Sequence, residues 1–144
     1  MTRHMTTAID ADGIATLTWD SPGTAPNVFS NETIAEFTAE IRGLLGNPAV
    51  KGIVITSTKR DFIVGADLTM LLAAMKGTRA EMFEKVRSLQ QLYRDVETGG
   101  KPVVAAMNGT AVGGGFELAL ACHARIVVDD PAIRLGLPEV QLGL

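Results

Sequence analysis

The first third of the chain changes from a two-residue to a helical repeat of apolar positions. Residues 7–9 and 14–20 flank an Ala-Asp-Gly turn, and within the second segment Ala15, Leu17 and Trp19 alternate with residues 14, 16 and 18. This alternation predicts a β-hairpin. After a loop, Ser30 or Asn31 is expected to cap a helix, whose apolar positions are Ile34, Phe37, Ile41, Leu44 and Leu45.

The middle of the chain alternates between short β-rich runs and helical patterns. Residues 52–57 fit a buried strand, and a loop over residues 58–67 leads into a short helix over residues 68–75. Thr78 and Glu81 form a capping box for a long helix. Its apolar positions are Met82, Val86, Leu89, Tyr93 and Val96, and another buried strand is predicted over residues 103–107.

Three consecutive glycines, Gly113 to Gly115, follow an Asn-Gly turn and begin a short apolar helix that ends at Cys122. Strands are predicted over residues 125–128 and 132–135, and Pro138 fits the first turn of a helix or 3-10 turn. Strands therefore alternate with helices in a ββα rhythm, which is typical of an α/β fold, and no linker divides the chain. Its 144 residues are enough for one domain with a core.

Composition and charge narrow the classes of function. The net charge is −3, the pI is about 5.3 and no Lys/Arg-rich run is present, so nucleic acid is not an expected partner. No apolar run has the length of a membrane span, and the N-terminus has no signal-peptide pattern. We expect a soluble cytoplasmic protein. A single cysteine and no Cys/His cluster argue against an internal disulfide and a metal site.

The glycine triplet is the first chemical feature of the chain. A dinucleotide fingerprint needs a glycine where Leu118 stands, and a Walker phosphate loop needs Gly-Lys-Ser/Thr where Phe116, Glu117 and Leu118 stand. Two interpretations remain: backbone N–H groups aimed at an oxygen that gains negative charge, or glycines that only permit close packing of helix on strand.

Two acidic residues, Glu117 and Glu139, each lie near the start of a short helix in an apolar stretch. Either one alone is explained by the favourable position of an acid at a helix N-terminus. Together in apolar surroundings they predict a pair of carboxyls with raised pKa values that share a proton and act on a water molecule. They are the candidate acid–base pair.

Other polar residues have structural interpretations. Asp67 is expected to cap the helix that follows it, and Cys122 to be a small buried residue. His123 is expected to make a favourable contact with a helix dipole, and Arg125 to bind helix-end carbonyls or pair with an acid.

Three segments together resemble the enoyl-coenzyme A hydratase/isomerase (crotonase) superfamily. They are residues 108–119, with the Gly-Gly-Gly-Phe-Glu run, residues 134–143, with Leu-Pro-Glu, and Phe62-Ile-Val-Gly-Ala-Asp67. The last is especially similar to the hydratase module of the multifunctional fatty-acid oxidation complex α subunit. The resemblance implies a crotonase-like spiral of ββα repeats, with an N-terminal tail over residues 1–5 and a partial domain over residues 6–144.

The resemblance also implies roles for named residues. The N–H groups of Ala66 and Gly114 bind the thioester oxygen, and Glu117 and Glu139 hold the catalytic water, with the roles of base and acid left open between them. The substrate-binding positions it implies are Phe62, Gly65, Ala66, Asp67, Leu68, Gly113 and Gly114. The implied function is enoyl-CoA hydratase in fatty-acid β-oxidation, with coenzyme A as part of the substrate and no separate cofactor.

Members of this family continue well past the position of Leu144, and full-length members form oligomers. The chain is therefore expected to be incomplete at its C-terminus, with apolar faces left open, low stability and weak activity at best. Two alternatives to hydration stay open. One is another crotonase chemistry, such as isomerisation or acyl-CoA hydrolysis, and the other is a non-catalytic chain that only binds acyl-CoA or a partner subunit.

Overall fold

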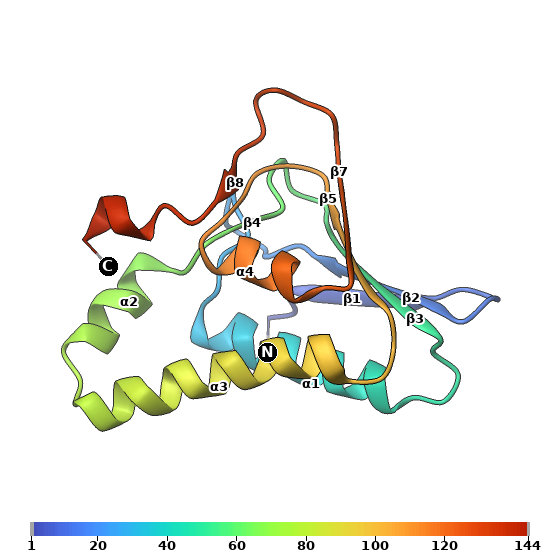
Figure 1. Ribbon diagram of the computed structural model, residues 1–144, viewed down its shortest axis with the longest axis horizontal. Helices are drawn as coiled ribbons and strands as arrows, with labels where there is room; N and C mark the ends of the chain where they lie inside the picture. The colour runs from blue at the N-terminus through green and yellow to red at the C-terminus, as the bar shows by residue number, and fades with distance from the viewer. Residues whose placement is uncertain (1, 144) are drawn as a thin grey trace.

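The computed structural model of the chain describes residues 2–143, which form two sheets flanked by helices (Figure 1). The strands are β1 (Met5–Ile9), β2 (Ile14–Trp19), β3 (Gly52–Ser57), β4 (Ile63–Val64), β5 (Val103–Met107), β6 (Ala111–Val112), β7 (Ala124–Val127) and β8 (Leu135–Gly136). The helices are α1 (Asn31–Gly46), α2 (Leu68–Met75), α3 (Arg79–Thr98), α4 (Gly114–Ala121) and the 3-10 helix η1 (Glu139–Leu142). The five-stranded sheet has the order β1-β2-β3-β5-β7, and the three-stranded sheet the order β4-β6-β8.

The predicted hairpin forms the first edge of the large sheet. β1 and β2 are antiparallel, with Met5 opposite Trp19, and the Asp10 carboxylate accepts the N–H groups of Asp12 and Ile14 in the turn. Gly13 has φ +86°, and a Cβ there would lie 2.7 Å from the Ala49 carbonyl oxygen. The turn therefore needs glycine for both backbone conformation and space.

The remaining strands of the large sheet are parallel, and helices connect them as predicted. Ser30 caps α1 in a reciprocal box with Thr33, and the buried face of α1 includes Phe37 and Ile41. Trp19 stacks on Phe37 at 5.7 Å between ring centroids and meets Phe29 edge-on at 5.2 Å. This aromatic cluster joins the large sheet to α1.

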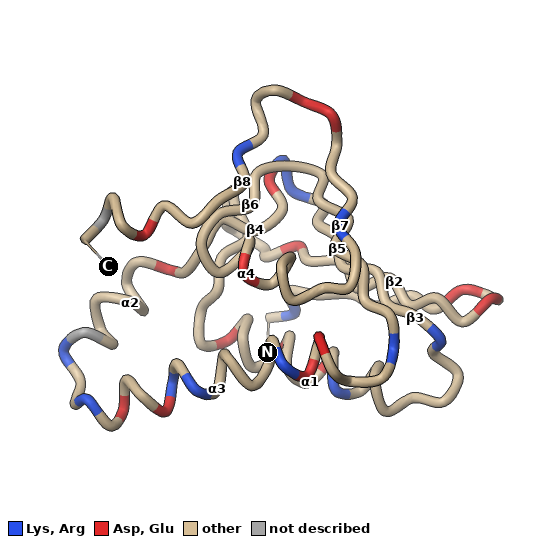
Figure 2. Tube along the Cα trace, viewed as in Figure 1, with Lys and Arg blue, Asp and Glu red and all other residues tan. Residues whose placement is uncertain are grey.

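Helix α3 is buried along only part of its length. Its predicted capping box of Thr78 and Glu81 is present, and Leu92 and Val96 are buried in its second half. Val86, which the predicted apolar stripe placed in the core, is 47% exposed. Acidic and basic residues are interspersed along the helix (Figure 2), which is typical of a solvated helix surface.

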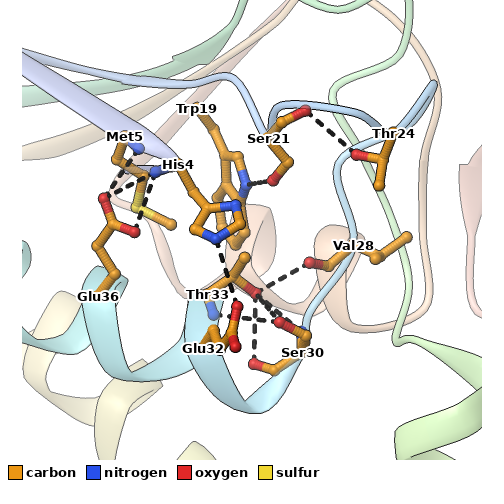
Figure 3. Close-up of polar contacts among 10 residues, drawn as sticks. All are labelled: His4, Met5, Trp19, Ser21, Thr24, Val28, Ser30, Glu32, Thr33 and Glu36. Atoms are coloured by element: carbon orange, nitrogen blue, oxygen red, sulfur yellow. Dashed lines mark hydrogen bonds and ion pairs between the residues drawn. The ribbon is translucent and has the colours of Figure 1, made fainter. Parts of the chain in front are cut away.

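The boundary predicted between a tail over residues 1–5 and the domain is too late in the chain. Met5 begins β1 and is 1% exposed, and the Glu36 carboxylate of α1 accepts the backbone N–H groups of both His4 and Met5 (Figure 3). The packed structure therefore includes at least residues 4 and 5, because α1 holds their backbone. Met1 lies outside the described residues.

The small sheet was not predicted. β4 and β6 lie in segments expected to be loops and turns, and the strand expected over residues 132–135 is observed at Leu135–Gly136. The reason for the shift is a turn at Asp130, whose carboxylate and carbonyl oxygens accept the N–H groups of Ala132 and Ile133. Two-residue strands are too short to show a two-residue apolar repeat.

The last part of the chain is open to solvent, in agreement with the expected open apolar faces. Every residue of β7 is exposed, and Ile126, Val128 and Val140 are 64%, 54% and 80% exposed. The connection from β7 to β8 extends away from the body of the molecule (Figure 1). Within residues 2–143, no helix is both long enough and apolar enough to cross a bilayer.

Candidate active site

A cleft of about 680 Å³ lies where the small sheet meets α1, α2 and α3. Its polar lining includes Glu117 and Glu139, and a wall of apolar side chains includes Val28, Ile34 and Leu89. Mostly apolar clefts with a few convergent polar groups are the usual form of small-molecule sites. The two candidate carboxyls are therefore brought together in one cleft.

Gly113 lies between the two glutamates. Glu117 is in the first turn of α4, and Glu139 begins η1. The N–H of Gly113 donates to the Gly136 carbonyl at 3.0 Å, which ties the start of α4 to the strand before η1. Gly113 has φ +54°, and a Cβ there would lie 2.7 Å from Oε1 of Glu139. Glycine at position 113 thus lets the Glu139 carboxylate lie directly against the backbone.

The pKa of Glu117 is raised by partial burial and, to a smaller extent, by the negative charge of Glu139. Desolvation and a like charge both disfavour the ionised form, so Glu117 keeps its proton to a higher pH than an exposed glutamate does. This direction agrees with the raised pKa expected for a carboxyl beside another in apolar surroundings.

Two backbone N–H groups at the cleft have no protein acceptor among the described residues. Gly114 is the first residue of α4, where an N–H has no partner within the helix. Phe29 pairs with Ala66 by donating to the Gly65 carbonyl and accepting the N–H of Asp67. This pairing leaves the Ala66 N–H on the other side of its strand.

The small sheet brings these two N–H groups to the same cleft. β4 and β6 are parallel, with Val64 opposite Val112, so the segments that leave them start side by side. Gly65 has φ +76° and Gly113 has φ +54°, and both conformations are unfavourable for other residues. Ala66 and Gly114 both line the cleft.

Most of the predicted substrate-binding residues lie in the cleft, and one does not. The lining includes Gly65, Ala66, Asp67, Leu68, Gly113 and Gly114. Phe62 is 0% exposed and belongs to the core, and its carbonyl accepts a hydrogen bond from the buried Asn27 side chain. The Phe62 ring therefore lies in the core, and the substrate-binding role expected for this loop, mostly through its backbone, stays a prediction.

Asn27 supports the site and was missed in the sequence. Its buried amide donates to the Trp19 carbonyl and to Oγ of Ser57, and accepts the N–H of Ser21. Its backbone carbonyl accepts the N–H of Val64 in β4. Asn27 thereby connects the large sheet to the strand that leads into Gly65 and Ala66. A polar residue in a loop has no apolar repeat to reveal such burial.

The structural interpretations of the other polar residues are mostly confirmed. The Asp67 carboxylate caps α2 by accepting the N–H of Met70, and Arg125 donates to the carbonyls of Ala119 and Cys122. Burial raises the pKa of the Cys122 thiol to about 12. The helix-dipole contact expected for His123 is replaced by a specific bond, in which Nδ1 accepts the N–H of Val103 at 3.1 Å. Residues 2–143 contain no cluster of three potential metal ligands.

Comparisons with known proteins agree on one family. A model of the family described as Enoyl-CoA hydratase/isomerase matches residues 10–144. A structure described as an enoyl-CoA hydratase/isomerase (crotonase) from Legionella pneumophila has a TM-score of 0.88 and 29% identity, covering 98% of this chain and 53% of that chain. For an enoyl-CoA hydratase from Geobacillus kaustophilus the values are 0.87 and 28%, covering 100% and 52%.

A third structure, described as an enoyl-CoA hydratase from Streptomyces coelicolor, has a TM-score of 0.84 and 30% identity, covering 100% of this chain and 51% of that chain. The chain thus spans about half the length of these relatives. The fold of the chain matches that part of each of these structures.

Proposed function

The chain belongs to the enoyl-CoA hydratase/isomerase family, and from this premise we propose that it adds water across the 2,3 double bond of an enoyl-CoA thioester. One observation carries the proposal: two carboxyls and two backbone N–H groups, which have no acceptor within residues 2–143, line the same cleft. The segment over residues 62–67 resembles a fatty-acid oxidation module, and this resemblance favours β-oxidation as the pathway.

In this proposal the N–H groups of Ala66 and Gly114 bind the thioester oxygen. Attack of water at Cβ moves electrons through the conjugated system and makes this oxygen an enolate oxygen in the transition state. Donors already oriented toward a developing negative charge stabilise it without reorganisation, and losing one costs about 3 kcal/mol of barrier.

In this proposal, Glu117 and Glu139 accept a proton from water and donate a proton to the substrate. Water gives its oxygen to Cβ and one proton to the carboxyl pair, and the pair gives one proton to Cα as the enolate collapses, so the net addition is one water molecule. The raised pKa of Glu117 suits this exchange, because it brings the pKa of the carboxyl closer to neutral pH, where the protonated form can donate and the ionised form is a stronger base.

The apolar wall of the cleft binds the acyl chain in this proposal, and residues 65–68 bind the thioester end. Val28, Ile34, Leu71 and Leu89 line the wall. Burial of apolar surface contributes about 25 cal/mol per Å² to binding of the chain.

Hydration of crotonyl-CoA tests the proposal. We expect the chain to consume the conjugated thioester, and Glu117→Gln and Glu139→Gln each to lower kcat about 100-fold or more, because each removes a proton carrier. Glu84→Gln is the matched control, since Glu84 is exposed on α3 and does not line the cleft. Equal activity in all four proteins would contradict the assignment.

The alternatives give different results in the same proteins. If double-bond isomerisation is a second activity of the cleft, Glu117→Gln should abolish hydration and spare much of the isomerisation of a 3-enoyl-CoA. Equal loss of both activities would count against the roles assigned here. Calorimetric binding of crotonyl-CoA without turnover would indicate a chain that only binds acyl-CoA.

A further inference from the structure

Tyr93 connects α3 to the first turn of α4. Its hydroxyl donates a hydrogen bond to the Gly114 carbonyl at 3.0 Å, across 21 residues of sequence. Gly113, the residue before α4, provides no side-chain cap, and other side-chain bonds to α4, from Arg125 and Cys122, reach its C-terminal half. Among the described residues, Tyr93 is the one side chain that holds this first turn by a hydrogen bond.

The start of α4 consists of glycine. Residues 113–115 are all glycine, and glycine has more backbone freedom than any other residue. Two aromatic side chains occupy the space beside Gly114, since a Cβ added there would lie 3.1 Å from the Phe29 ring and 3.4 Å from the Tyr93 hydroxyl. The observed restraint of the phenol on Gly114 is therefore its hydrogen bond.

We propose that Tyr93 is a positioning residue, whose hydrogen bond to the Gly114 carbonyl orients the Gly114 N–H toward the thioester oxygen. The inference rests on the proposed function and names a group that neither the sequence motifs nor the family match assigns. Fixing the carbonyl of Gly114 limits rotation about its own backbone, and the N–H of the same residue is the donor in question.

The surroundings of Tyr93 keep its hydroxyl protonated, so that the hydroxyl remains a hydrogen-bond donor. Burial raises the pKa of the Tyr93 hydroxyl, and the negative charges of Glu117 and Glu139 raise it further. A phenol that stays protonated through the working pH range cannot lose this bond by ionising. The same two carboxyls that act on water therefore also stabilise the donor state of Tyr93.

The test compares parent, Tyr93→Phe and Thr98→Val. Tyr93→Phe keeps the ring and removes only the hydroxyl. Thr98→Val is the matched control, because its hydroxyl also donates to a backbone carbonyl, that of Arg94, on the same helix but outside the cleft. The readouts are kcat and KM for crotonyl-CoA, and the infrared stretch of its isotope-labelled thioester carbonyl when bound.

We expect Tyr93→Phe to lower kcat about tenfold with KM changed less than about twofold, since the Gly114 N–H would be less well oriented toward the thioester oxygen in the transition state. The bound carbonyl stretch should move back toward its value in free crotonyl-CoA. Thr98→Val should match the parent in both. A Tyr93→Phe protein with parent-like kcat and carbonyl stretch, or with raised KM and unchanged kcat, overturns the proposal.

A second substitution at position 93 distinguishes loss of the hydroxyl group from a folding defect in Tyr93→Phe. Tyr93 is the single tyrosine of the chain, so biosynthetic 3-fluorotyrosine enters only this position. It retains the hydroxyl donor, and we expect kcat within about twofold of the parent and a parent-like carbonyl stretch. A tenfold loss with this conservative replacement also overturns the proposal.

Failure of the proposed function would give a different result from failure of the positioning role of Tyr93. If the parent neither hydrates crotonyl-CoA nor shifts its carbonyl stretch, the function itself is wrong, and the role of Tyr93 falls with it. If the parent does both and Tyr93→Phe does as well, hydration stands and only the positioning role is overturned.

Discussion

The five-stranded and three-stranded sheets of this molecule are built in opposite ways. In the large sheet, the strands β2, β3 and β5 have five or six residues each and carry alternating buried side chains, and Leu17 and Ile55 are almost fully buried. In the small sheet, strands of two residues bury few large side chains, and two segments that leave it have glycines at positive φ. The large sheet supplies the core, and the small sheet orients the backbone at the cleft.

This difference predicts that the two sheets contribute separately, the large sheet to stability and the small sheet to function. Substitutions in the large sheet should mainly change the free energy of unfolding, and those around the small sheet should mainly change ligand binding and catalysis. The four predictions below test this separation, from the largest expected effect to the smallest.

Leu17→Ala should destabilise the whole molecule by about 2–5 kcal/mol, because it removes a buried side chain and leaves a cavity. Denaturant unfolding followed by fluorescence of Trp19, the single tryptophan, measures the loss. Thr16→Ala, half-buried on the opposite face of the same strand, is the control and should cost much less. Equal losses for the two variants would show that the core does not lie on the Leu17 face.

Gly115→Ala should cost about 1–3 kcal/mol and weaken binding of crotonyl-CoA, because the new Cβ would lie 2.1 Å from the Ile63 carbonyl oxygen of β4. Either β4 or α4 must move, and both lead into the proposed oxyanion site. Denaturant unfolding and calorimetric titration measure the two effects. Gly136→Ala in β8 is the control, since a Cβ there has no neighbour within 4 Å. A parent-like Gly115→Ala protein would contradict this packing.

Asp67→Ala should cost about 1 kcal/mol, because it removes the N-cap of α2. The loss should appear as faster hydrogen exchange of the α2 amides, with little change in the large sheet. Asp67→Asn is the control, since asparagine caps helices about as well as aspartate. If Asp67→Asn exchanges as fast as Asp67→Ala, the carboxylate charge matters more than the cap.

Glu117→Gln should slightly stabilise the fold at pH 8, by less than about 1 kcal/mol, although we expect it to lower the proposed hydration about 100-fold or more. The pKa of Glu117 is raised in the folded state, so ionising this carboxyl above that pKa disfavours folding. As the pH falls through the raised pKa and then below the ordinary glutamate value of about 4.3, the advantage of the variant should disappear. Melting temperatures from pH 8 to pH 4 measure it, and a stability difference that grows as the pH falls would contradict the shift.

Sequence patterns predicted the large sheet and its helices well, since each signal is local. The hairpin turn, the N-cap of α1, the capping box of α3, and the buried strands β3 and β5 all lie where residue types and spacing place them. The short strands β4 and β6 were missed, and β8 was predicted too early, because two residues cannot show a repeat.

Sequence motifs named the residues of the candidate site but only some of the contacts that these residues make. Glu117, Glu139, Ala66 and Gly114 were named from motifs, and all of them line the cleft. The inward position of Phe62 and the burial of Asn27 depend on which strands pack together. The partner of Tyr93 was equally hidden, since the apolar repeat of α3 places its ring near the core without showing what its hydroxyl contacts.

The sequence alone predicted the longer helices and strands, and three of its motifs resembled the family to which the chain belongs and pointed to Glu117 and Glu139 as candidate carboxyls. Only the tertiary structure decided that the N–H groups of Ala66 and Gly114 have no acceptor within the described chain, and that Tyr93 anchors Gly114. The physical reason is that local patterns report the repeat of one segment. A free donor or a shared cleft depends instead on segments distant in sequence that packing brings together.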